Sequence, residues 1–157
     1  MRARTANWFE TKIKYQKTQD DGTEKVVTEL YVVDALTCAE AENRITEEIA
    51  PYHGGESNVT STSEAVFKEV FFSDNDDDDK WYKAKLQFIT IDEKTEKEKR
   101  SNVTYLVQAK SLARALRYVD DVMGKSMIDY DIIGLNETKV LDVFEHSSSA
   151  ENTEENE

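Results

Sequence analysis

Tryptophan and lysine side chains recur at the spacing of a β-strand in two segments of the chain. The first segment contains Trp8, Lys12 and Lys14, and the second contains Trp81, Lys83 and Lys85. Alternate residues of a strand lie on one face, so each segment brings an indole ring and two ammonium groups to the same face. Indole rings stack on unpaired bases, and ammonium groups neutralise phosphates. The pattern predicts a surface that binds single-stranded nucleic acid.

The alternative fate of such a face is burial. Leu30, Val32 and Leu106 are predicted to lie on the faces opposite Tyr31 and Tyr105. A sheet that carries helices on one face and apolar side chains on the other must cover that second face. The three aliphatic residues are therefore interface candidates. This alternative predicts a self-assembling protein–protein interaction module, a homo-oligomer, that binds no nucleic acid.

A run of aspartates has part of the spacing of a calcium loop. Asp74, Asp76 and Asp78 alternate as the first ligands of such a loop do. The loop also needs a glycine where this chain has Asp79, and a bidentate glutamate where it has Lys85. The run is therefore predicted to be a solvated acidic linker without a metal.

No motif in the chain predicts a catalytic centre. The sequence contains no HExxH, GxSxG or GxxxxGK pattern. Glu64 recurs as Glu137, and Glu69 recurs as Asp142, which leaves an enzyme with a symmetric carboxylate site as a third alternative. These carboxylates occupy positions that are more often exposed on strands. We therefore predict a protein that is not an enzyme and that needs no cofactor.

The net charge of -13 is unevenly distributed. The aspartate run and the glutamates of 147–157 carry most of it, so the remainder is only mildly acidic and broad phosphate binding is disfavoured. The start, MRARTANWFE, has no apolar signal region, and no apolar run reaches the roughly 20 residues of a membrane span. These features predict a cytoplasmic protein that does not bind membranes.

Three pairs of segments are similar at an offset of 73 or 74 residues. Residues 7–18 align with 80–91, 31–45 with 105–119, and 59–71 with 132–144. The repeat predicts an internally duplicated β-β-α-β unit. The predicted divisions are a first half at 1–73, an acidic linker at 74–79, a second half at 80–146 and a disordered acidic tail at 147–157.

Within each half, local signals predict a hairpin followed by a helix. Gln19 to Gly22 is a turn signal, and Thr37 with Glu40 has the spacing of a capping box. The first helix would bury Cys38, Ala41, Ile45 and Ile49, and the second would bury Leu112, Ala115, Leu116, Val119, Val122 and Met123. The predicted fold is α+β, mainly an antiparallel sheet with two helices on one face.

Several extended motifs of the chain resemble one family. They are NWFETKIKY at 7–15, TELYVVDALTCAEAE at 28–42, FFSD at 71–74 and WYKAKLQFITIDEKTEKEKR at 81–100. Over roughly residues 7–144 the chain resembles the domain of unknown function 4494, a family of Bacteroidota and of their phages and mobile elements. The resemblance implies an intracellular bacterial or phage setting and assigns no activity.

Taken together, the sequence predicts a non-enzymatic binding or accessory protein. The more specific hypothesis is an accessory protein of phage or mobile-element DNA metabolism that contacts single-stranded nucleic acid or a replication partner.

Overall fold

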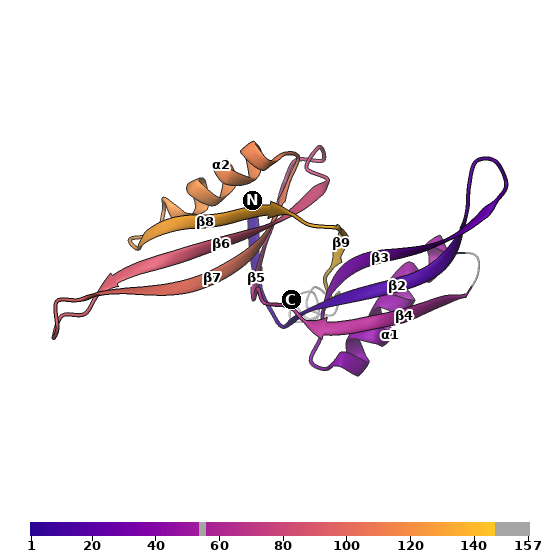
Figure 1. The fold of residues 1–157 in the computed structure, drawn as a ribbon, viewed down its shortest axis with the longest axis horizontal. Helices are drawn as coiled ribbons and strands as arrows, with labels where there is room; N and C mark the ends of the chain where they lie inside the picture. Colours follow the sequence, from indigo (N-terminus) through magenta and orange to yellow (C-terminus); the bar gives the residue numbers. More distant parts are fainter. Residues whose placement is uncertain (54–55, 147–157) are drawn as a thin grey trace, which may run out of the picture. The chain divides into compact units, whose positions relative to one another are not determined.

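The computed structural model describes residues 1–53 and 56–146 of the 157-residue chain. Its strands are β1 (Arg2–Thr5), β2 (Trp8–Thr18), β3 (Glu24–Asp34), β4 (Ser57–Glu64), β5 (Glu69–Phe72), β6 (Lys80–Ile91), β7 (Glu98–Ala109), β8 (Asp129–Glu137) and β9 (Val140–Phe144). Its helices are α1 (Cys38–Ile49), the short 3-10 helix η1 (Ala50–Tyr52) and α2 (Leu112–Met123). The fold is therefore a mixed α+β fold made mostly of strands (Figure 1).

The strands form two separate sheets, whereas the predicted fold placed both helices on one sheet face. Unit 1 comprises residues 1–5 and 66–139, and unit 2 comprises residues 6–65 together with the chain from 140 onward. The chain passes between the units after Thr5, after Ala65 and after Lys139. The predicted division at residues 74–79 is therefore wrong, because that segment lies inside unit 1. The predicted tail at 147–157 lies outside the described residues.

Unit 2 has a four-stranded sheet in the order β4-β2-β3-β9. β2 and β3 form the predicted hairpin, whose turn is closed by a hydrogen bond from the Gly22 amide to the Gln19 carbonyl oxygen (3.0 Å). Gly22 has a φ of 86°, which glycine adopts without strain. One face of the sheet packs against α1, and the core between them consists of Phe9, Ile13, Val33, Ala35, Ala41, Ile45 and Ile49.

Unit 1 has a five-stranded sheet in the order β1-β5-β7-β6-β8. Figure 1 shows α2 lying along one face of this sheet. The core between the helix and the strands consists of Phe71, Ala84, Leu86, Tyr105, Val107, Val119 and Met123. Each helix thus packs on its own sheet, so the predicted single sheet with two helices on one face is not formed.

The two units share their element order and their irregularities. Each has a hairpin, a helix and a third strand that pairs with the first strand of the hairpin. The pairing of β2 with β4 shifts register between Lys12 and Ile13, and the pairing of β6 with β8 shifts between Lys85 and Leu86. These two bulges are 73 residues apart, which is the offset of the sequence repeat.

The helix caps follow the predictions, whereas part of the burial does not. The Thr37 hydroxyl accepts a hydrogen bond from the Glu40 amide (3.1 Å), and the Glu40 carboxylate accepts one from the Leu36 amide (2.9 Å). Cys38, predicted to be a core residue, is exposed because it begins the helix before the buried stripe starts. Leu112 and Leu116, also predicted to be buried, are 51% and 42% exposed, since α2 faces its sheet through Ala115, Val119 and Met123.

Candidate functional site

The tryptophans predicted to form a base-stacking surface are buried. Trp8 is 0% exposed and Trp81 is 2% exposed. Trp81 packs edge-on against Phe72 of β5, with ring centroids 5.7 Å apart. Burying an indole removes a large apolar area from water, and a buried ring has no free face for a base. The prediction that these two side chains form a binding surface is therefore wrong in this conformation.

The lysines of the same surface remain near solvent. Lys12, Lys14 and Lys85 are exposed, and Lys83 is half-buried with its ammonium nitrogen 5.9 Å from the centroid of the Phe67 ring. Alternation along β2 places Glu10 on the same face as Lys12 and Lys14. This face therefore mixes both signs of charge and lacks exposed indoles.

The three interface candidates belong to the interior of the described chain. Val32 and Leu106 are both 0% exposed, and Leu30 is half-buried beside Val140 of β9. Their cover comes from the chain's own units, so a contact with a second subunit stays a prediction. Val32 and Leu106 offer no accessible surface to a second subunit.

A strand from later in the chain completes the sheet of unit 2. β9 follows β8 of unit 1 and pairs in parallel with β3. Val143 is buried, and the Phe144 ring lies against Tyr31 with centroids 5.7 Å apart. Immediately after the strand, the His146 amide donates a hydrogen bond to the Asp34 carboxylate (2.8 Å). The same carboxylate forms an ion pair with Arg44 of α1, which ties the end of the strand to the helix.

Unit 1 is completed in the same way by a strand from earlier in the chain. β5 follows β4 of unit 2 and pairs in parallel with β7. Val70 and Phe71 are buried, and the Phe71 ring stacks on Tyr105 with centroids 5.0 Å apart. The Ser73 amide then donates to the side-chain oxygen of Gln108 (2.9 Å). Each of these contacts corresponds to one made by β9, 73 or 74 residues away.

Both completing strands contain an acid, a valine and a phenylalanine in succession. The acids are Glu69 and Asp142, which pair in register with Tyr105 and Tyr31 respectively. Burial raises the pKa of the half-buried Glu69, and partial desolvation raises the pKa of Asp142, which keeps an exposed surface. These carboxylates, predicted as a possible catalytic set, thus belong to separate units at corresponding positions.

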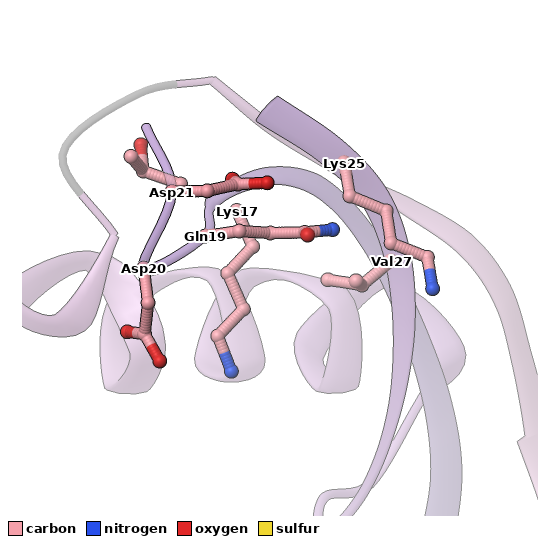
Figure 2. A pocket seen from close by; sticks show the side chains of 7 residues that line it. Lys17, Gln19, Asp20, Asp21, Lys25 and Val27 are labelled. Atoms are coloured by element: carbon pink, nitrogen blue, oxygen red, sulfur yellow. The ribbon is translucent and has the colours of Figure 1, made fainter. Parts of the chain in front are cut away.

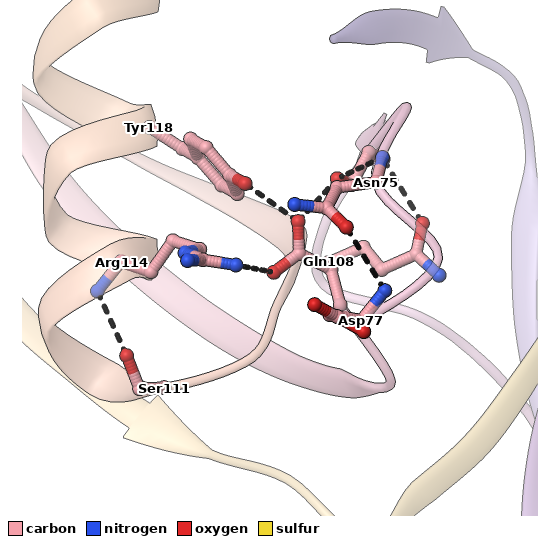
Figure 3. A network of polar contacts seen from close by, with 8 residues as sticks. Asn75, Asp77, Gln108, Ser111, Arg114 and Tyr118 are labelled. Carbon is pink, nitrogen blue, oxygen red and sulfur yellow. Dashed lines mark hydrogen bonds and ion pairs between the residues drawn. The ribbon is translucent and has the colours of Figure 1, made fainter.

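The aspartate run contains a buried ionic contact rather than a wholly solvated linker. The Asp78 side chain is fully buried, and it accepts hydrogen bonds from the Tyr118 hydroxyl (2.5 Å), Arg114 (3.2 Å) and the Ser73 hydroxyl. Figure 3 shows Arg114 and Tyr118 pointing from α2 toward this loop. Burial alone would raise the pKa of Asp78, but the hydrogen bonds outweigh it and hold the pKa below its ordinary value. The contact fixes the loop to α2.

A second titratable cluster lies in unit 2. The Glu29 carboxylate accepts hydrogen bonds from the hydroxyls of Tyr15 and Tyr31, the latter at 2.5 Å. Burial and the nearby Glu29 raise the pKa of Tyr15 to about 12, so its hydroxyl stays protonated at neutral pH. The His53 ring stacks on Tyr15 with centroids 3.7 Å apart. The cluster covers the end of the core of unit 2, since Tyr15 and Tyr31 both pack against it.

Hollows lie on the surface of each unit, and one beside β2 is lined by side chains that include Lys14, His53 and Glu56. Figure 2 shows another of about 570 Å³ at the tip of the β2–β3 hairpin, lined by side chains of both charges that include Lys17, Asp20 and Lys25. Across residues 1–53 and 56–146, no group of three or more His, Cys, Asp or Glu side chains could hold a metal ion. Neither helix in that part of the chain is long and apolar enough to cross a membrane.

Sequence reasoning missed that β5 and β9 each join the unit other than that of the preceding strand, and it missed the burial of Asp78. One sequence signal pointed to the equivalent roles of these strands, because an acid, a valine and a phenylalanine recur at 69–71 and 142–144, after the third strand of each half. No local signal distinguishes Asp78 from the other aspartates of the run.

Comparison with known proteins identifies the family. The family model described as a domain of unknown function (DUF4494) matches residues 7–146. No curated protein and no solved structure matches the chain. The matched residues include every described strand and helix of both units except β1. The chain therefore belongs to the DUF4494 family.

Proposed function

We propose that this chain is a non-enzymatic accessory protein that binds partner proteins inside a bacterial cell. The partner would contribute an extended segment that pairs with the edge strand β4. The intracellular setting, in Bacteroidota or in their phages and mobile elements, is part of the proposal and rests on the resemblance of the motifs.

The observation that carries this proposal is the composition of β4. β4 ends the sheet order β4-β2-β3-β9, so among the described strands of unit 2 it has a neighbour on one side only. From Ser57 to Ser63 it contains no charged residue and no proline, and most of these side chains are exposed. Natural edge strands are usually protected by charges, prolines or bulges, and β4 has only the bulge opposite Lys12 and Ile13. An uncharged strand edge favours the addition of a partner strand.

The non-enzymatic part of the proposal is supported by how the buried carboxylates are used. Asp78 accepts three side-chain hydrogen bonds, and Glu29 accepts two. Carboxylates engaged in this way stabilise contacts within the fold, so they are poorly placed to exchange protons with a substrate.

Single-stranded nucleic acid is the second ligand class to test. The exposed Lys12, Lys14 and Lys85 support a contact with phosphates. The burial of both indoles and the net charge of -13 disfavour it. Protein binding is therefore the function that the geometry supports best.

We further propose that the chain arose by internal duplication. The matching bulges support this history, and so do three pairs of hydrogen bonds at the same offset. The Ala65 amide donates to the Trp8 carbonyl oxygen, as the Thr138 amide does to that of Trp81. The Glu40 amide donates to the Thr37 hydroxyl, as the Arg114 amide does to that of Ser111. The His146 amide donates to the Asp34 side chain, as the Ser73 amide does to that of Gln108. Bonds of this kind depend on local geometry, so their repetition supports a common origin of the two halves.

Affinity capture from a lysate of the bacterial host, with and without nuclease, tests the function. The full chain should retain a partner protein after nuclease treatment. The double variant Ser61→Lys/Ser63→Lys places charges on the β4 edge and should lose that partner. The double variant Val26→Lys/Thr28→Lys is the matched control, because it adds the same two charges at exposed alternate positions of β3 instead of β4 and should retain the partner.

A direct binding measurement separates the second ligand class. Fluorescence anisotropy of labelled oligo-dT at low salt should show no binding by the full chain. Binding that weakens as salt rises, together with capture that depends on nucleic acid, would reject the protein-binding proposal in favour of nucleic acid.

A further inference from the structure

The sheet of unit 2 already accepts a strand that arrives from a separately folded unit. β9 is joined to β8 of unit 1, and its residues pair with Leu30, Tyr31, Val32 and Val33 of β3. The β3 edge therefore recognises a strand through backbone pairing, the buried Val143 and the contact of Phe144 with Tyr31. None of these contacts requires that the strand and the edge belong to the same copy of the chain.

β9 is held by fewer neighbours than the corresponding strand β5. Among the described strands, β9 ends its sheet order and pairs with β3 alone, whereas β5 lies between β1 and β7. The segment that follows β5 is also fixed to α2 through Asp78. Release of β9 breaks one ladder, while release of β5 breaks two ladders and disturbs the Asp78 contact.

The connection that leads into β9 is short. The amide and hydroxyl of Thr138 both donate to the carbonyl oxygen of Trp81, at 2.9 and 2.8 Å, which fixes Thr138 to unit 1. Val140 is already paired with Leu30 in unit 2. Lys139 is thus the single residue that connects Thr138, fixed in unit 1, to Val140, paired in unit 2.

We propose that the β3 edge also accepts β9 from a second copy of this chain, so that two copies form a reciprocal strand-exchanged dimer. The dimer contains the same strand pairs, the same aromatic contact and the same His146–Asp34 hydrogen bond as the monomer. Its formation is therefore governed by protein concentration and by the length of the connection at Lys139. This inference concerns the β3 edge and does not depend on the proposed function of β4.

Changing the length of the connection tests the proposal. Deletion of Lys139 leaves no residue for the passage within one copy, so the variant should be predominantly dimeric by light scattering coupled to size exclusion. Insertion of two glycines after Lys139 is the matched control, because a longer connection eases pairing within one copy and should give a monomer. A deletion variant that is folded and monomeric at all concentrations would overturn the proposal.

A cysteine pair identifies the strand that is exchanged. In a Cys38→Ser background, Leu30→Cys and Val140→Cys place one thiol on each strand of a registered pair. This chain keeps Lys139, so the test does not depend on whether the deletion variant folds. After unfolding and refolding under oxidising conditions, it should give internally bridged monomers at low concentration and bridged dimers near the millimolar range.

Three outcomes decide the question. A bridged dimer that increases with concentration supports the proposal, and a Val143→Asp variant of the same chain should lose both bridged species. Bridged monomers at every concentration would show that β9 pairs only within its own copy. A dimer that forms without the bridge would show that another surface is used, and either of these last two results would overturn the proposal.

Discussion

At the scale of single residues, neighbours rather than composition determine the role of a carboxylate. Asp78 lies in a run of acids whose other members are exposed, yet its own side chain is fully buried. The difference comes from Tyr118 and Arg114, which lie 40 and 36 residues further along the chain. A charge run is usually solvated, and the sequence contains no local sign that two donors on α2 will reach one member of it.

Removing the Asp78 carboxylate should destabilise unit 1. Asp78→Ala leaves Arg114 and Tyr118 without their acceptor, and the loss of hydrogen bonds to a buried carboxylate costs about 1.5 to 3 kcal/mol. Urea unfolding followed by circular dichroism would measure the free energy of unfolding. Asp76→Ala removes an exposed acid from the same loop and should change that free energy by less than about 0.5 kcal/mol. Equal effects of the two changes would contradict the role assigned to Asp78.

Two groups of carboxylates should give opposite pH dependences. The folded pKa of Asp78 lies below its ordinary value of 3.8, so its stabilisation is present above that pH and is lost as the pH falls through the folded pKa. Burial raises the folded pKa of Glu69 above 4.5 and that of Asp142 above 3.8. Their ionisation opposes folding at neutral pH, and this effect is relieved as the pH falls through their folded values. Stability should therefore rise toward mildly acidic pH and then decline below about pH 4.

The double variant Glu69→Gln/Asp142→Asn isolates the first of these effects. Its free energy of unfolding, measured by urea titration at successive pH values, should lack the rise toward mildly acidic pH and keep the decline below it. If the difference between this variant and the wild type does not change with pH, the two acids do not titrate as their burial indicates.

At the scale of elements, local signals predicted what depends on neighbouring residues. The turn at Gly22 and the cap at Thr37 form as expected, because their hydrogen bonds join residues close in sequence. The stripe of Ala41, Ile45 and Ile49 is also buried as expected, because helical spacing alone places these residues on one face. Burial at the helix ends was predicted less well. Leu112 has the right spacing for a core position but begins α2 and remains exposed.

Which sheets β5 and β9 join could not be predicted from the same signals. β9 pairs with β3 more than 100 residues earlier, and the pairing is parallel, so no turn specifies its register. The apolar pattern of Val140 to Phe144 predicts a strand without naming the sheet that receives it. The candidate surface failed for a related reason, since strand alternation places Trp8 on a face but does not say what covers that face.

Phe71 of β5 and Phe144 of β9 should each stabilise a sheet whose other strands lie far away in the sequence. Phe144→Ala should increase hydrogen exchange in β3 of unit 2 and leave β8 little changed, although β8 is the nearer strand in the chain. Phe71→Ala should increase exchange in β7 of unit 1 and spare β4. The fully buried Phe71 should lose about 3 to 5 kcal/mol, and the half-buried Phe144 less. Exchange that increases in β8 after Phe144→Ala would contradict the assignment of β9 to unit 2.

At the scale of the whole molecule, the units and the halves of the sequence are different divisions. The repeat divides the chain once, whereas the folded chain passes between its units three times. Neither half of the sequence contains all the strands of one unit. A fragment of the first half would therefore lack β9 of unit 2, and a fragment of the second half would lack β1 and β5 of unit 1.

Truncation tests this relation between sequence and fold. A chain that ends after Lys139 keeps all of unit 1 and loses β9, so hydrogen exchange should increase in β2, β3 and α1 and remain low in β6 and β7. A chain that ends after His146 retains β9 and its anchoring amide, and it should exchange like the full chain. Equal protection of unit 2 in both truncated chains would show that β9 contributes nothing to its sheet.

The position of β9 also sets an order for folding on the ribosome. Most of unit 2 is translated first, but its last strand emerges only after the final residue of unit 1. Once Lys139 has left the exit tunnel, every strand of unit 1 is available, so unit 1 can complete its sheet before unit 2. Unit 2 lacks β9 until the five residues of that strand have emerged, and until then its β3 edge stays open. Nascent chains on neighbouring ribosomes present the same edge at the same stage of synthesis.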